Sequence, residues 1–536
     1  MEDCTRARRR DSGPALFLVL LSGACSTASY VADADREVAA ILDVANREVL
    51  GARPDWVLQP APATPPPAEP LPPTTPPITE PAIARPAETY DLARALATAV
   101  HSNREFLVRR ESLYRQGLAT SATRFQFGPQ FASTISYLWP TAENSTAQHG
   151  AAIGVTASQI LPTGGTLAAS TGLDAAWPYG TLAGERAFGT AAGITLTQPL
   201  LRGAGYEASH ESLTQAEREL VFAIRDFELF RESFSIGIAQ RFFELASQKK
   251  TLAIEDANYD AAVFDRGQAE ALHQVGRNAD QQVFRARRRE IEAKDQLIDA
   301  RAGYDRAVDE FKILLGLPIA TLIELADADP PYVPVRIDAN SAVAAARHNR
   351  LDLITDRQRL EDAERALRIA ENGLLPDLSL VASYGLGGNS RDLDLAGPDE
   401  WSSSIGLAFT VPLQQNDQRN NYRSVQIALE QTRRGLLLRE DQLDLDIRDA
   451  LRRLKSIEER IALQQEQIVQ EQGAVTVTQI RYEAGQLENR DLLEARQALV
   501  NAQNALIRLK VDHFVGRLNL QKDLGIFFVD EQGMWR

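Results

Sequence analysis

The chain has 536 residues and a formal net charge of −15, and 24% of its residues are charged. The acidic balance argues against a nucleic-acid-binding protein, which would present a basic face, and the composition is not that of a generically disordered chain. No stretch holds the roughly 18 apolar residues that a membrane-spanning helix needs, so the chain could cross a membrane only as a closed β-barrel.

Residues 1–25 have the features of an export signal. A basic start that includes Arg8 precedes a short apolar core, Pro14 to Leu21, and small residues then precede Cys25. The order resembles a bacterial lipoprotein signal, in which this cysteine becomes the lipidated first residue of the mature protein. The alternative is an ordinary buried cysteine after a short apolar run. With Cys4 as the only other cysteine, neither a disulfide framework nor a metal cluster is expected.

Residues 26–87 form an N-terminal segment and a linker. A short helix is predicted for residues 26–50. Residues 54–86 hold thirteen of the chain's 26 prolines, a composition typical of an extended polyproline-type spacer without a core. The plainer interpretation is a disordered linker that has no partner.

The rest of the chain divides into two similar units, residues 88–317 and residues 341–527. A linker, residues 318–340, lies between them, and a short tail, residues 528–536, follows the second unit. Each unit opens with an amphipathic helix, expected over about 95–115 in the first unit and about 342–372 in the second. Each helix ends near a proline, Pro129 or Pro376, after which an alternating segment begins.

These alternating segments predict β-strands. In the first one Phe131, Ile135 and Tyr137 point one way, while Thr134 and Ser136 point the other way. The same alternation recurs in residues 194–197, 378–385 and 404–411. One apolar face and one small polar face suit a transmembrane β-strand with lipid outside and water inside, although half-buried strands of soluble proteins look similar.

The first unit also has two further candidate strands, at residues 151–160 and 165–174, joined by Leu161-Pro162-Thr163-Gly164-Gly165. The second unit has no counterpart of this extra hairpin, so its place in the fold is left open.

Each unit then continues into a long helical hairpin, most clearly in the second unit. Apolar residues recur there at intervals of seven: Ile447, Leu454, Ile461, Ile468, Val475 and Tyr482. Such a repeat makes a helix coil around partner helices. At about 1.5 Å per residue, a helix over 419–482 would be roughly 95 Å long. A glycine turn at 484–486 and a returning helix over 487–524 complete the hairpin.

The hairpin occurs twice in the sequence. A shift of 209 residues places the second return arm on the first with seven identities and no gap: Gly485 on Gly276, Ala495 on Ala286, Arg496 on Arg287, Ala502 on Ala293, Leu506 on Leu297, Leu524 on Leu315 and Gly525 on Gly316. These matches lie at the turn and on the inward face, which argues for an internal duplication.

The order helix, strand pair, long helix, glycine turn, long helix, given twice, resembles the TolC-type outer-membrane efflux and secretion channels over about residues 88–527. Three motifs carry the resemblance in detail: Leu375-Pro376 before a strand, Gln198-Pro199-Leu200 after one, and Arg481-Tyr482-Glu483-Ala484-Gly485 at the turn. The implied fold is mainly α with a membrane β-barrel. It is a homotrimer in which each protomer gives four strands to one twelve-stranded barrel, continued by the helices as a periplasmic tunnel.

The resemblance implies an acidic ring at the periplasmic mouth of the tunnel, which would act as a gate or selectivity site. The matching residues are Asp491 and Glu494, just after the second hairpin turn. Three copies would place six carboxylates around one constriction, favouring cations. Gln282 and Arg285 hold the equivalent places in the first unit, so no ring is expected there. The alternative is that both acids lie on a solvated helix face.

The resemblance also implies that the hairpin tips meet a periplasmic adaptor protein. The tip residues are Val275, Gly276 and Arg277 in the first unit and Ala484, Gly485 and Gln486 in the second. The alternative is that the two glycines serve only the turns.

The sequence has no phosphate-binding glycine loop, no His-x-x-x-His pair and no nucleophile elbow, so neither enzymatic activity nor a cofactor is expected. The leading hypothesis is a passive exit duct in the bacterial outer membrane, docked to an adaptor and an inner-membrane transporter, for efflux or type I secretion. The rival is a soluble periplasmic coiled-coil scaffold without conductance. A third possibility is a degenerate family member that binds the cell wall through its proline spacer.

Overall fold

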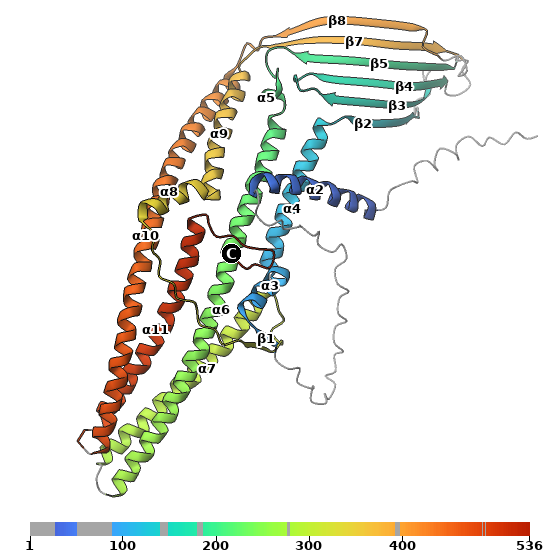
Figure 1. Ribbon diagram of the computed structural model, residues 1–536. Coiled ribbons are helices and arrows are strands. Elements are labelled where there is room, and N and C mark those ends of the chain that lie inside the picture. Colours follow the sequence, from blue (N-terminus) through green and yellow to red (C-terminus); the bar gives the residue numbers. More distant parts are fainter. Residues whose placement is uncertain are drawn as a thin grey trace, which may run out of the picture.

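The structure is a computed structural model that describes residues 27–50, 88–139, 148–178, 186–275, 279–391, 397–484, 486–487 and 489–535. A β-sheet lies at one end, and long helices run away from it to two hairpin turns at the other end (Figure 1). The predicted signal with Cys25 and the proline-rich spacer lie outside the described residues. None of the described helices combines the length and apolar composition needed to traverse a bilayer.

The helix predicted over 26–50 is present as α2, Thr27–Leu50. It lies across α4, Arg104–Phe127 (Figure 1), and buries Val38 and neighbouring apolar residues. Gly117 of α4 permits the close approach, because a Cβ at that position would lie 2.8 Å from a Val38 methyl group. The segment before the first unit is therefore packed against that unit.

The two halves of the chain have the same order of elements. Each half opens with a short helix and a longer one: α3 Leu92–Ser102 and α4 in the first, α8 Ala339–Asn349 and α9 Leu351–Asn372 in the second. Strands follow, and a pair of long helices ends each half: α6 Glu211–Gln274 with α7 Asp280–Leu315, and α10 Asn416–Glu483 with α11 Asn489–Asp523. A single-turn helix, α5 Tyr206–Ser209, precedes α6.

The prediction of one continuous helix at the start of each unit is wrong, because both helices break. In the first half the break is at Asn103, whose backbone is extended (φ −67°, ψ 127°) and whose side-chain oxygen accepts a hydrogen bond from the Phe106 amide. The side-chain amide of Asn103 also donates to the Leu314 carbonyl oxygen at 2.7 Å. In the second half the break is at Arg350, which has similar dihedrals (φ −72°, ψ 119°).

Both breaks lie against the end of a long return helix. Gly316 follows α7 with φ +77°, and Gly525 follows α11 with φ +68°, a region that favours glycine. A Cβ at Gly316 would lie 2.1 Å from the Ser102 carbonyl oxygen, and one at Gly525 would lie 2.8 Å from the Asn349 backbone. Backbone contact with a distant helix end thus occurs at each break, and helix propensity cannot reveal such a contact.

The predicted long helix is confirmed in the second half. α10 has 68 residues, so at about 1.5 Å per residue it is roughly 100 Å long. The residues of its seven-residue repeat are buried or half-buried along the inward side: Ile447, Leu454, Ile461, Ile468, Val475 and Tyr482. This seam packs against α11 and, nearer the sheet, against α8 and α9. Packing of this apolar side against its neighbours stabilises the helix, because most helical stability in proteins comes from tertiary packing.

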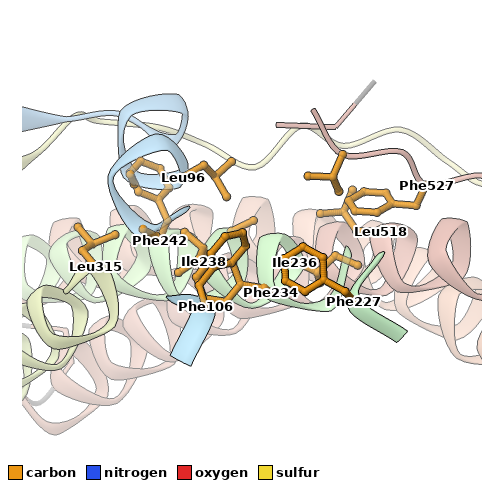
Figure 2. Close-up of a cluster of buried hydrophobic side chains, with 14 of the residues drawn as sticks. Leu96, Phe106, Phe227, Phe234, Ile236, Ile238, Phe242, Leu315, Leu518 and Phe527 are labelled. Carbon is orange, nitrogen blue, oxygen red and sulfur yellow. The ribbon is translucent and has the colours of Figure 1, made fainter. Parts of the chain in front are cut away.

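The main hydrophobic core lies where α3 and α4 pack against α6, and Figure 2 shows its side chains. The Phe106 ring lies 5.1 Å from the Phe234 ring and 5.8 Å from the Phe227 ring, measured between centroids. Leu518 and Phe527 reach the same core from the second half of the chain. The two halves therefore share this main core.

The linker and the tail also pack on this core. β6, Ile323–Leu325, pairs in parallel with β1, Glu88–Tyr90. In the tail, the backbone carbonyl oxygens of Val529 and Asp530 accept hydrogen bonds from the guanidinium of Arg231, a buried residue of α6. Both connections tie later segments to the first half.

The sheet has six strands, each antiparallel to its neighbours, in the order β2-β3-β4-β5-β7-β8. They are β2 Gln130–Leu138, β3 Gln148–Ile160, β4 Thr166–Pro178, β5 Ala187–Pro199, β7 Asp377–Ser390 and β8 Glu400–Thr410. The extra hairpin predicted at 151–174 is present as β3 and β4, and it lies between β2 and β5. The four strands per chain that the resemblance implied are thereby corrected to six in the described sheet.

Candidate functional site

One face of the sheet is apolar from edge to edge. The strand register aligns Ile135 with Ile153, and Ile153 with Leu173. The same face continues across the remaining strands through Phe188, Ile194, Leu196, Leu380, Tyr384, Leu386, Ile405, Leu407 and Phe409. In the single chain Phe131 is 76% exposed and Ile405 is 81% exposed. A contiguous apolar surface of this extent indicates an apolar environment or a partner that covers it.

The opposite face carries small and polar side chains. Its members include Thr134, Ser136, Thr156, Ser170, Thr195, Ser383 and Ser404. The hydroxyl oxygens of Ser383 and Ser404 lie 2.7 Å apart across β7 and β8. The predicted alternation is therefore present, and it fits strands that have lipid on one side and water on the other.

Aromatic side chains gather at the end of the sheet that lies away from the helices. Tyr137 lies 6.0 Å from Trp177 between ring centroids, and His149 stacks on Trp177 at 5.7 Å. Trp139 meets the edge of the His149 ring, and the Tyr137 hydroxyl lies 2.9 Å from His149 Nδ1. Rings with a polar tip concentrate where hydrocarbon meets water, so this cluster fits one boundary of a membrane layer.

The hairpin tips lie at the opposite end of the molecule from the sheet (Figure 1). Of the predicted tip residues, Val275 is 68% exposed, and Ala484 and Gln486 are also exposed. Gly276, Arg277 and Gly485 lie outside the described residues. The exposed tip residues are available to a partner, which is what an adaptor contact requires.

The predicted acidic residues Asp491 and Glu494 lie in the first turns of α11, and both are exposed. Arg490 Nε donates to a Glu494 carboxylate oxygen at 2.6 Å, so part of the acidic charge is offset on the same helix. Gln282 and Arg285 occupy the start of α7. Within the described ranges, no group of three or more His, Cys, Asp or Glu side chains is placed to hold a metal ion.

A buried ion pair near the tips was not predicted from the sequence. Arg496 Nη1 of α11 lies 2.8 Å from Asp265 Oδ2 of α6, and Arg496 Nη2 donates to Gln479 of α10 at 2.9 Å. Asp265 is only 1% exposed. Burial raises the pKa of the Asp265 carboxyl above its ordinary value, while the charges of Arg496 and Arg289 act in the opposite direction. This pair joins the first helical hairpin to the second.

A signal for this pair exists in the alignment of the two halves. In the first hairpin the equivalent arginine, Arg287, forms an ion pair with Glu270 at 2.9 Å. The residue equivalent to Glu270 in the second hairpin is the uncharged Gln479. Arg496 therefore has no acid in its own hairpin at that place, which indicates a carboxylate elsewhere.

A sheet with one apolar and one polar face, mounted on helical hairpins about 100 Å long, defines a class of protein. Its sheet fits a lipid layer, and its helices extend far beyond that layer. Outer-membrane channels with a long helical extension have this construction.

Comparisons with known proteins agree with this class. A family model for outer membrane efflux proteins matches residues 342–525. Outer membrane protein TolC of Escherichia coli K12 is 23% identical over 357 residues, which cover 63% of this chain and 69% of that protein. The pyoverdine export outer membrane protein OpmQ of Pseudomonas aeruginosa is 22% identical, covering 62% of this chain and 69% of that one. The CmeC outer membrane channel of Campylobacter jejuni has the same fold, with a TM-score of 0.61 at 17% identity over 81% of this chain and 85% of that chain.

The resemblance to TolC-type outer membrane efflux channels that was drawn from the sequence is confirmed by the family match over residues 342–525 and by these relatives. This family consists of passive channels and not of enzymes. Its members are proteins of the outer membrane.

Proposed function

We propose that the protein is the outer-membrane channel of a tripartite efflux or type I secretion system, a passive trimeric exit duct that crosses the outer membrane and extends into the periplasm. The observation that carries this function is the sheet face that is apolar across all six strands and exposed in the single chain. The match to outer membrane efflux proteins favours the channel over a soluble periplasmic scaffold, which would have no use for such a face.

Closure of the sheet requires further copies of the chain. β2 and β8 are the two edges of the described sheet, and unpaired backbone groups are costly in lipid. β2 runs away from the helices and β8 runs back toward them, so β8 of one copy is antiparallel to β2 of the next. Pairing these edges around a ring of three copies, as in the family, gives a barrel without an edge.

The helices also support association. On α7, Phe284, Ile291 and Ile298 recur at intervals of seven and are 67%, 69% and 57% exposed. On α10, Leu463 and Val477 are 66% and 50% exposed. Apolar residues at heptad spacing stabilise a helix when a partner helix covers them. Neighbouring copies in a tubular trimer would supply those partners.

The two halves support a duplicated origin of this scaffold. They share the order of elements, and each ends a long helix with a left-handed glycine, Gly316 or Gly525, against a helix break. Two such units per chain give a trimer six similar sectors, which suits a tunnel of nearly even circumference.

The remaining parts have roles at the two ends of the duct. The exposed tips around Val275 and Gln486 would contact a periplasmic adaptor, and an inner-membrane transporter would supply the energy. Lipidation at Cys25 would add an anchor in the outer membrane. No nucleic-acid partner is proposed, given the net charge of −15.

The test is expression in a Gram-negative host followed by membrane fractionation, gel mobility with and without heating, and planar-bilayer recording. A channel is expected in the outer-membrane fraction, as a heat-modifiable trimer that conducts ions. Release of the protein by high salt as a non-conducting species would refute the channel and support the scaffold.

A further inference from the structure

We infer that the hairpin β3–β4 is part of the barrel wall, so that the trimer has eighteen strands in the membrane. The hairpin adds no helix to the tunnel that continues the barrel. This inference rests on the proposed trimeric channel and concerns the width of its membrane part. Six strands from each of three copies make the eighteen.

The hairpin pairs with both of its neighbours along its length. Its register with β2 runs from Gln130 opposite Ser158 to Leu138 opposite Gly150. On the other side β4 pairs with β5 from Thr166 to Ala176. A hairpin folded over the sheet, or lying outside it, would leave β2 and β5 free to pair with each other, and they do not.

The hairpin also continues both faces of the sheet. Ile153, Val155 and Leu173 point to the apolar side together with Ile135 of β2 and Ile194 of β5. A slip of one residue would turn every one of these side chains to the other face. The lipid-facing pattern thus extends through the inserted strands, and this requires that they lie in the wall.

The turn of the hairpin is fixed to the junction between sheet and helices. The Gly205 amide donates to the Thr163 carbonyl oxygen at 2.9 Å, and Gln198 Nε2 donates to the same oxygen at 3.0 Å. Gly164 has φ +87°, and a Cβ there would lie 2.4 Å from the Gly203 carbonyl oxygen. The turn is therefore held against the segment that leads from β5 into α6.

The hairpin adds circumference to the sheet alone. β2 and β7 follow α4 and α9, and β5 and β8 lead into α5–α6 and α10, whereas β3 returns directly to β4 through residues 161–165. Four strands of each chain thus continue as helices and two do not. Since barrel diameter grows roughly linearly with strand number, eighteen strands give about one and a half times the diameter of twelve. The narrowest part of the duct is then in the helices, and the membrane part has the strand number at which porin barrels enclose an aqueous channel.

A deletion variant tests the inference. Replacing residues 140–185 by Asn-Gly joins the outer ends of β2 and β5, whose apolar faces point the same way, through a turn that favours hairpins. Polyethylene glycols of graded size are then added to the side of the bilayer that holds the strand-connecting loops. The largest radius that still enters and lowers conductance should be about 1.5-fold greater in the full chain than in the deletion variant.

A cysteine pair covers the case in which the deletion variant does not fold. Ala132 and Thr156 are register partners on the polar face, so the full chain with Ala132→Cys and Thr156→Cys should form an intrachain disulfide in heat-modifiable, membrane-inserted trimers. The matched single variants should not.

The outcomes separate the two proposals. Two results would overturn the wide barrel and leave the proposed channel function intact. One is a membrane-inserted trimer of the double-cysteine variant that does not form the disulfide. The other is an equal limiting polymer radius for the full chain and the deletion variant. Absence of any inserted trimer of the unmodified chain would overturn the proposed function, and the wide barrel with it.

Discussion

The first and second halves of the chain use one order of elements, but they differ at both ends of the molecule. At the sheet, the first half contributes β2 to β5 and the second contributes only β7 and β8. At the tips, Arg287 pairs with Glu270 inside its own hairpin, whereas the equivalent Arg496 reaches Asp265 of the other hairpin. Between these ends the halves match, since Gly316 and Gly525 take the same conformation against the same kind of helix break.

The difference teaches where such a scaffold can change. The middle is fixed by backbone contacts that leave no room for a side chain. The sheet end faces lipid and water, where an inserted hairpin needs only to keep the register and the two faces. The tip end joins two hairpins, where a new ion pair can link them. The two halves therefore differ where they contact lipid, water or each other, and they match where each half packs on itself.

The largest expected effect separates the two equivalent arginines. Arg496→Ala leaves the buried Asp265 carboxylate without its cation, and removing one partner of a buried pair costs about 3–5 kcal/mol of unfolding free energy. Arg287→Ala breaks a partly exposed pair and leaves Glu270 paired with Arg266, so it should change stability little. Thermal unfolding of the purified trimer, followed by circular dichroism, makes the comparison. Equal losses in the two variants would contradict the difference between the hairpins.

The next effect concerns the two left-handed glycines. Gly525→Ala should cost about 1–3 kcal/mol, because alanine is strained at positive φ and its Cβ would lie 2.8 Å from the Asn349 backbone. Gly316→Ala should cost more, about 2–4 kcal/mol, because its Cβ would lie still closer to backbone, 2.1 Å from the Ser102 carbonyl oxygen. Gly303→Ala in α7, where no atom beyond the helix's own backbone lies within 4 Å of the added Cβ, is the matched control and should stabilise slightly. Equal thermal unfolding midpoints for Gly316→Ala and Gly303→Ala would show that the end of α7 does not stabilise the helix break at Asn103.

The elements were predictable from sequence where their signal is local. The heptads of α10 and the alternation in β2, β7 and β8 follow from burial at a fixed period. The strands β3 and β4 were also visible, but their place was not, because pairing with β2 and β5 is a long-range property. The breaks at Asn103 and Arg350 could not be seen, since the contacts there come from helix ends roughly 175–215 residues further along the chain.

The candidate site divides in the same way. Asp491 and Glu494 were named because a family resemblance marks their position, and the structure adds that Arg490 pairs with Glu494. The ion pair of Asp265 with Arg496 joins residues 231 positions apart, so neither residue looks unusual in its own helix. The one indication of this ion pair in the sequence is that Gln479 replaces the equivalent Glu270 of the first half.

The buried carboxyl also predicts a dependence of stability on pH. Because the pKa of Asp265 is raised in the folded protein, the folded state binds a proton more readily than the unfolded state. This carboxyl therefore adds most to stability below its ordinary pKa, and that contribution is lost as the pH rises through the raised value. Asp265→Asn should remove this component when unfolding midpoints are compared between about pH 3 and pH 7.

Asp491→Asn, which changes an exposed carboxylate, is the control for the pH series. It should keep the pH profile of the unaltered protein. A profile of Asp265→Asn that coincides with both would show that the carboxyl does not titrate differently in the folded state.

The smallest expected effect is on ion selectivity at the tips, where the halves again differ. Asp491→Ala with Glu494→Ala should weaken cation preference, because these acids would ring the mouth of the duct. A carboxylate about 8 Å from a passing ion contributes roughly 0.5 kcal/mol in water, or about a twofold change in relative permeability. Since Arg490 already offsets Glu494, Asp491→Ala alone should give most of the change. The equivalent pair of the first hairpin, Gln282→Ala with Arg285→Ala, removes no acid and should not lower cation preference. Reversal potentials under a salt gradient measure all three variants, and an unchanged potential in the acidic double variant would place both carboxylates on a solvated face away from the ion path.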